Sequence, residues 1–191
     1  MSAFTNCKNQ NPDFQKRLNI WMSDRKVRES AMLQTNLEVP KKKRLLFSLP
    51  EFFLGRTQAN GFFETSFGKV KKTFSADITG FWKDDQFCMN EHFEFSDGTA
   101  EDRSWFLVAK QEGIFQAHCS DIASPVLVRH EENTATMSYT IGLSIADKKV
   151  NVRFTDLFVM LSDTSVLNRS SVSKWGLPIG RLVISFSKLQ D

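Results

Sequence analysis

The sequence predicts a mainly β fold, a single closed antiparallel up-and-down barrel, with an N-terminal amphipathic helix in front of it. Three observations predict this class. From Gly55 onward, apolar and polar residues alternate with period two. Turn-forming residues recur every ten to fourteen residues, which is the spacing of hairpins. Phe accounts for 18 of the 191 residues, which indicates a large interior lined by rings.

Residues 1–47 form the predicted helical arm, and residues 48–191 form the predicted barrel domain. The arm carries ten Lys and Arg against four Asp and Glu, whereas the rest of the chain carries fifteen against eighteen. The arm is therefore basic and the domain mildly acidic. An amphipathic helix is predicted over residues 13–32 because four apolar side chains share one helical face: Phe14, Leu18, Trp21 and Met22.

Ser48 and Glu51 read as a capping box for a short helical turn, predicted over residues 50–54.

A longer segment, residues 162–178, is predicted to be irregular. The short connections elsewhere predict an up-and-down order. A barrel hides its edge strands, and a sandwich would do so too but usually needs longer crossings. Eight strands are predicted, at residues 56–67, 69–82, 86–95, 101–110, 113–121, 134–144, 149–161 and 179–188.

One carboxylate is predicted to point into the barrel. Glu91 shares its face of the strand with apolar side chains, so it needs a partner. With a bulge at Gly98, Arg103 would lie diagonally from Glu91 on this face; with a two-residue turn, Arg103 would point outward. A structural ion pair, a ligand-anchoring pair and an acid–base pair are the alternatives. The predicted cavity-lining residues of this strand are Phe87, Met89, Phe93 and Phe95.

No catalytic residue, cofactor or metal site is predicted. The three histidines lack metal-binding spacing, and no phosphate loop or dinucleotide fingerprint occurs. Three cysteines, an odd number, are typical of free thiols in a reducing compartment. Because neither a signal peptide nor an apolar run of about 18 residues is seen, a cytoplasmic location is expected.

The basic run at residues 41–44 is the strongest local charge signal. It is read first as a solvated linker. A nuclear-import patch and a weak contact with an anionic membrane are the alternatives, the latter contributing about 1 kcal/mol per charge. No nucleic-acid binding is expected, and nothing in the sequence indicates an oligomeric state.

A set of motifs recurs in order over about 140 residues: Pro50-Glu51-Phe52-Phe53-Leu54-Gly55, Gly61-Phe62, Phe67-Gly68-Lys69-Val70, Glu91-x-Phe93-x-Phe95-x-Asp97-Gly98, Arg103-x-Trp105, Tyr139, Phe154-x-Asp156, Leu167-Asn168-Arg169 and Lys174-Trp175-Gly176. This order resembles an uncharacterised bacterial family, domain of unknown function 3833, which is regarded as lipocalin-like. The resemblance implies a calycin-type barrel with a cavity for a small apolar or amphipathic molecule, and it names no reaction.

The chain departs from that family in two respects: the export signal typical of the family is absent, and residues 123–125 and 131–133 stand where the family tends to have glycines. The G-x-W mark of lipocalins is also missing, at Gly55-Arg56-Thr57. The resemblance to true lipocalins is therefore one of architecture.

Three functions fit the sequence. In the first, the barrel binds a small apolar or amphipathic ligand whose polar head lies near a cation. In the second, the barrel is a lyase or isomerase acting on a hydrophobic substrate, with Glu91 or Asp156 as base. In the third, the basic arm binds an anionic surface. The candidate ligand-binding or structural residues are Glu91, Arg103, Trp105, Asp156, Arg169 and Lys174.

Overall fold

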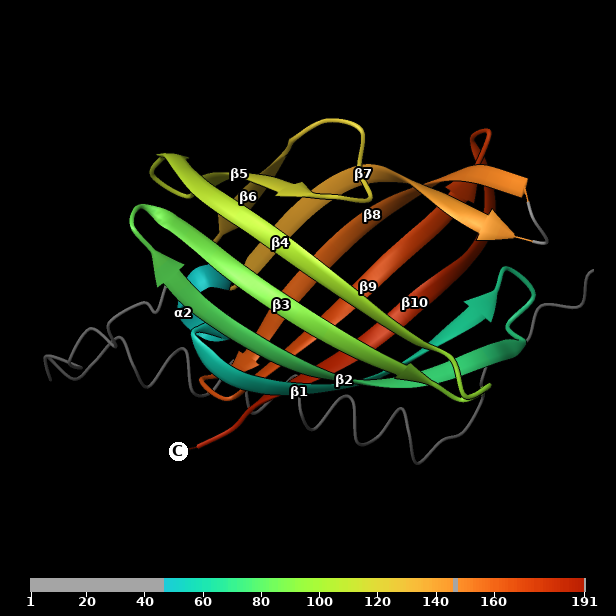
Figure 1. Cartoon of the computed structure of the whole chain (residues 1–191), viewed down its shortest axis with the longest axis horizontal. Helices are drawn as coiled ribbons and strands as arrows, with labels where there is room; N and C mark the ends of the chain where they lie inside the picture. The colour runs from blue at the N-terminus through green and yellow to red at the C-terminus, as the bar shows by residue number, and fades with distance from the viewer. Residues whose placement is uncertain (1–46, 146–147, 191) are drawn as a thin grey trace, which may run out of the picture. The chain divides into compact units, whose positions relative to one another are not determined.

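The computed structural model describes residues 47–145 and 148–190, and it confirms the predicted fold class (Figure 1). The chain divides into two compact units, residues 1–43 and 44–191, and the description below concerns the second. The helix predicted over residues 13–32 and the basic run at 41–44 lie outside the described residues.

One short helix and ten strands make up the described part of the chain. Each strand pairs antiparallel with the next, and β1 pairs with β10, which closes the barrel (Figure 1). No helix among these residues is long and apolar enough to cross a membrane. The elements are α2 (Leu49–Phe53), β1 (Gly55–Thr65), β2 (Val70–Lys83), β3 (Gln86–Phe95), β4 (Ala100–Gln111), β5 (Ile114–Cys119), β6 (Val126–Glu131), β7 (Thr134–Ile145), β8 (Lys148–Ser162), β9 (Ser165–Lys174) and β10 (Leu177–Lys188).

Two strands, β6 and β9, are absent from the predicted set of eight. β9 lies inside residues 162–178, so the prediction of an irregular segment was wrong. Its inward positions include Asn168 and Ser170, and both residue types are rare in strands, so the apolar alternation is interrupted. β6 is only six residues long and carries Arg, His and Glu, which obscures its pattern.

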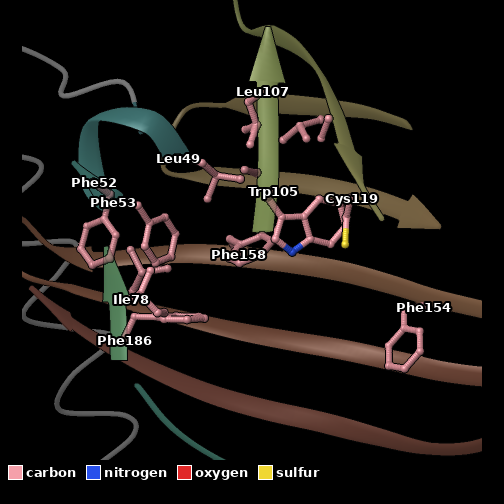
Figure 2. Close-up of a cluster of buried hydrophobic side chains, with 14 of the residues drawn as sticks. Leu49, Phe52, Phe53, Ile78, Trp105, Leu107, Cys119, Phe154, Phe158 and Phe186 are labelled. Atoms are coloured by element: carbon pink, nitrogen blue, oxygen red, sulfur yellow. The ribbon is translucent and has the colours of Figure 1, made fainter. Parts of the chain in front are cut away.

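The helix α2 closes one end of the barrel. Phe53 is 1% exposed and packs edge-on against Phe52 and Phe186, with ring centroids 5.0 and 5.1 Å away. Figure 2 shows these rings together near Ile78, whereas Phe154 lies apart from them. The void inside this end measures only about 20 Å³, which is room for about one water molecule. We call this filled end the closed half; its lining includes Leu49, Phe53, Phe87, Leu107, Val128 and Phe158.

A histidine, rather than the predicted capping box, holds the start of α2. Ser48 makes no side-chain capping bond, and Glu51 is exposed. Instead, the Leu49 N–H donates to Nε2 of His130 at 3.1 Å, and Nδ1 of His130 lies 3.3 Å from the Gly113 carbonyl. Burial lowers the pKa of His130, which favours the neutral ring that this pair of bonds requires. The helix is thereby tied to β6.

Close packing of α2 on β2 requires a glycine. A Cβ added to Gly80 would overlap the Phe53 carbonyl oxygen and lie 2.7 Å from the Phe87 ring. We expect Gly80→Ala to lower the free energy of unfolding by about 2 kcal/mol, because a backbone group cannot rotate away. Chemical denaturation measures this change. Gly142→Ala is the control, since its Cβ would meet only Asn151 Oδ1 at 3.5 Å; equal losses in both variants would contradict the packing argument.

Candidate functional site

The half of the barrel away from α2, which we call the open half, is lined by side chains that point inward yet stay partly exposed. A side chain on the inner face of a closed sheet meets solvent where solvent enters the barrel or where the side chain lies at the rim or beside an outer groove. Phe87, in the closed half, is fully buried. The partly exposed inward side chains are Phe63, Phe74, Phe93, Phe95, Tyr139, Leu182 and Ile184.

Glu91 and Arg103 lie directly opposite each other on the inner face. The β3–β4 turn has three residues, closed by the Phe95 N–H donating to the Thr99 carbonyl at 2.9 Å. Gly98 takes φ 80°, the left-handed conformation of a bulged turn. This register pairs Glu91 with Arg103, so the predicted diagonal placement was wrong although the shared face is as expected.

Arg103 pairs with a different carboxylate. Its Nε lies 3.0 Å from Oδ2 of Asp121, in the loop after β5, and a terminal nitrogen lies 3.8 Å from Glu101. The guanidinium also lies over the Phe93 ring, 5.6 Å from its centroid. Within the residues that the structure describes, Glu91 forms no ion pair. The expected Glu91–Arg103 pair is therefore replaced by Arg103–Asp121.

The carboxyl group of Glu91 is electrostatically destabilised. Burial raises its pKa from 4.5 to about 7, the Arg103 charge and the Trp105 indole oppose that rise, and the charge of Asp156 adds to it. A carboxyl group with this pKa can give up or accept a proton near neutral pH. It is also a strong acceptor for any donor that enters the open half.

A second carboxylate faces Glu91 from the opposite wall. β3 and β8 lie five places apart in the ring of ten strands, so Asp156 on β8 points across the interior. Asp156 is 4% exposed, and burial raises its pKa, while polar interactions with Ser170, Tyr139 and Asn168 oppose the rise. The open half thus contains two inward carboxylates on opposite strands.

Aromatic rings lie beside both carboxyl groups, Trp105 at Glu91 and Tyr139 at Asp156. Tyr139 stacks on Phe154 with centroids 5.5 Å apart and meets Trp105 edge-on at 5.3 Å. Burial, and then the charge of Asp156, raise the pKa of Tyr139 well above its usual value, so its hydroxyl stays neutral. The ring of Trp105 lies beside Cys119, its cross-strand partner (Figure 2). The site therefore combines an apolar surface with hydrogen-bonding groups.

Two buried polar atoms of β9 are incompletely hydrogen-bonded. Asn168 is 2% exposed and Ser170 is 1% exposed; Asn168 Oδ1 accepts no hydrogen bond from the described protein atoms, and Ser170 Oγ interacts with Asp156 without completing a well-formed hydrogen bond. Ser170 is the cross-strand partner of Asp156. Sequence reasoning had given Asn168 no role and had missed Ser170; the alternation from Val166 to Val172 is the signal that could have found them.

The remaining predicted residues occupy different places. Arg169 is exposed on the outer face, because its neighbours in β9 take the inward positions. Lys174 lies at the barrel rim with Nζ 4.3 Å above the Trp175 ring. Met89 points inward next to Trp105. In the described ranges, no three His, Cys, Asp or Glu side chains gather as a metal site would require.

A separate groove of about 640 Å³ lies on the outer surface of β1, β2, β3 and β10. Most of its lining residues alternate with the inward residues of the same strands, among them Phe62, Thr73, Glu94 and Val183, and the inward Phe74 and Phe95 border it as well. The groove is open to solvent, so it is a competing place for a small molecule.

Comparison with known proteins places the chain in a family. A family model described as a protein of unknown function, DUF3833, matches residues 29–188. The chain belongs to the DUF3833 family. The family predicted from the sequence motifs is therefore confirmed. No curated protein matches this DUF3833 chain.

Solved structures share its fold. The S-type phycobiliprotein lyase CPES from Guillardia theta has a TM-score of 0.57 at 8% identity, covering 74% of this chain and 91% of the lyase. A protein of unknown function from the DUF3598 family of Nostoc punctiforme has a TM-score of 0.54 at 10% identity, covering 75% of this chain and 50% of that one. At these identities the likeness concerns the barrel fold alone.

Proposed function

We propose that this DUF3833 protein binds a small apolar or amphipathic molecule in the open half of its barrel. The partly exposed inward rings carry the proposal, because a protein gains nothing in stability from rings that face solvent-filled space. Covering apolar surface of this kind contributes about 25 cal/mol per Å². The barrel fold shared with the phycobiliprotein lyase supports the interior as the place of binding and names no ligand.

The proposal includes a position for the ligand. Its apolar body packs against Phe63, Phe74 and Phe93, and its polar end reaches the zone of Glu91 and Tyr139. The closed half is filled, so the ligand stops there. This arrangement, rings around a few hydrogen-bonding groups, is typical of small-molecule pockets.

Two neighbouring residues of β10 provide a test of where a ligand binds. Leu182 points inward opposite Ser170, whereas Val183 points outward into the outer groove. We expect Leu182→Trp to weaken binding of the apolar dye N-phenyl-1-naphthylamine about tenfold or more, because the indole occupies the open half. We expect Val183→Trp to change the dissociation constant less than about twofold.

Dye fluorescence titrations measure both constants, and circular dichroism checks that each variant is folded. Loss of binding in Val183→Trp alone would assign the dye to the outer groove and contradict the proposal. Failure of the unmodified protein to bind the dye would contradict it as well. Native mass spectrometry of the purified chain then asks whether a small molecule co-purifies.

A further inference from the structure

The inner face of the open half carries three acceptor groups. Two are the carboxyl groups of Glu91 and Asp156, toward which Trp105 and, for Asp156, Ser170, Tyr139 and Asn168 act as donors. The third, Asn168 Oδ1, has no partner among the described residues. Arg103, opposite Glu91, pairs with Asp121. A ligand that brings donors would therefore complete the bonding of Asn168 Oδ1 and add to that of the carboxyl groups.

Incompletely hydrogen-bonded atoms beside the two carboxyl groups are a second sign of a binding site. Asn168 and Ser170 are nearly inaccessible, and both belong to inward positions of β9. An unsatisfied buried polar group costs about 1–3 kcal/mol, so water or a ligand must complete its hydrogen bonds. Ser170 pairs with Asp156 across β8 and β9, which places its hydroxyl on the same inner wall as that carboxylate.

The carboxyl groups of Glu91 and Asp156 face the same space inside the barrel. Because Glu91 and Asp156 project from opposite strands, a group held between them meets negative charge from both sides. The charge of Asp156 disfavours ionisation of Glu91, the Arg103 charge favours ionisation of both carboxyl groups, and an inserted cation would favour it further. Rings of Trp105, Tyr139 and Phe154 border the same volume and attract a cation through their faces.

We propose that Glu91, Asp156 and Asn168 together bind the nitrogen end of an otherwise apolar ligand, through N–H groups of an amine or similar cation. The inference rests on the proposed function, because it assumes that the open half holds a ligand. It replaces the expectation that Arg103, Arg169 or Lys174 lies near the polar head of the ligand. Arg103 stays with Asp121 and orders the mouth of the barrel.

Four probes that share a dodecyl group and differ in their polar end test this assignment. They are dodecylammonium, dodecyltrimethylammonium, dodecanol and dodecanoate, each titrated calorimetrically below its critical micelle concentration. We expect dodecylammonium to bind at least about tenfold more tightly than dodecanol, since a charge-assisted hydrogen bond contributes about 1.5–3 kcal/mol. Dodecyltrimethylammonium, which has the charge and no N–H, should lie between them. Dodecanoate should bind most weakly.

Two variants link the preference to the named groups. Glu91→Gln and Asp156→Asn should each reduce dodecylammonium affinity about tenfold and change dodecanol affinity less than about twofold. Glu94→Gln, on the outer face of the same strand as Glu91, is the matched control. If dodecanoate binds as tightly as dodecylammonium, or the variants keep the preference, this inference fails while the proposed function stands. If no probe binds, both fail.

A second surface carries an independent inference. The turns β1–β2 and β9–β10 lie at the open end of the barrel, and the Ser66 N–H donates to the Ile179 carbonyl at 3.2 Å, which sets them side by side. Each turn holds a ring in solvent: Phe67 is 97% exposed and Trp175 is 87% exposed. Val70, Leu177 and Ile179, on the same two hairpins, are exposed as well.

Neither stability nor turn chemistry explains these rings. Trp175 has φ 53°, a left-handed conformation that bulky side chains rarely adopt, and the Lys174 ammonium lies over its ring. Lys69 and Lys71 lie on the neighbouring hairpin, while its acid Glu64 is neutralised by Arg181 at 2.8 Å. Exposed rings beside lysines are complementary to an anionic bilayer surface, because the rings can enter its apolar layer while the lysines meet its negative headgroups.

We infer that these two hairpins dock on an anionic membrane surface. The test is co-sedimentation of the full chain with vesicles of phosphatidylcholine alone and of equimolar phosphatidylcholine and phosphatidylglycerol. We expect binding to the mixed vesicles only, and its loss when Phe67 and Trp175 are both replaced by Ser. Leu161→Ser, an exposed leucine near the opposite end, should bind as the unmodified chain does.

Three results would overturn this inference. Equal binding by the double variant would assign the contact to another part of the chain, such as residues 41–44. Failure of the unmodified chain to sediment with mixed vesicles would remove the membrane as partner. Concentration-dependent self-association that the double variant abolishes, seen by light scattering without vesicles, would assign the rings to a contact between copies of this chain.

Discussion

Replacing Glu91 with Gln is expected to raise the free energy of unfolding by up to about 3 kcal/mol at pH 8.5 and to leave it nearly unchanged at pH 4. The folded protein holds the pKa of Glu91 at about 7, against an ordinary value of 4.5, because burial disfavours the charged form. The stability that protonated Glu91 provides is complete below about pH 4.5 and is lost as the pH rises through about 7. Gln has no such transition.

Urea denaturation at both pH values measures the effect. Glu94→Gln is the control, because it removes an exposed carboxylate from the outer face of the same strand. It should change the free energy of unfolding by less than about 0.5 kcal/mol. A Glu91→Gln variant that is less stable than the unmodified protein at pH 8.5 would show that ionised Glu91 has a stabilising partner.

Replacing Phe53 with Ala is expected to lower the free energy of unfolding by about 4 kcal/mol. Phe53 is fully buried and joins α2 to the barrel through its ring contact with Phe186. Its loss leaves a cavity beneath the helix, which cannot collapse because Gly80 already touches the Phe53 backbone.

Chemical denaturation compares this variant with Phe67→Ala, which removes the same atoms from a solvent-exposed turn. The control should change stability by less than about 0.5 kcal/mol. If Phe53→Ala lowered the free energy of unfolding no more than Phe67→Ala does, α2 would contribute little to the stability of the fold. The comparison therefore isolates the packing of the helix from the general effect of removing a ring.

The architecture could be predicted from the sequence because most strands keep their apolar alternation. The inward face of β3, with Glu91 among aromatic side chains, follows from counting alternate positions. Its partner could not be found in this way. The β3–β4 register depends on a three-residue turn, and the choice of Asp121 over Glu91 by Arg103 depends on a loop some eighteen residues further along the chain.

β9 was missed for a physical reason that concerns the site itself. A strand is recognised by apolar residues at its inward positions, and β9 places Asn168 and Ser170 there. Hydrophobic periodicity therefore cannot reveal β9, the strand that carries two of the three buried polar side-chain atoms without a complete hydrogen bond among the described residues.

The position of α2 gives the barrel a floor. A barrel that is sealed at one end has a single opening, so a molecule bound inside would have to enter and leave by the same route. The filled half also limits the depth: if the open half holds a ligand as proposed, the part that fits between the rim and the filled half would be enclosed, and the excess of a longer molecule would remain in solvent. A barrel closed in this way would then select by length, whatever the chemistry of the molecule.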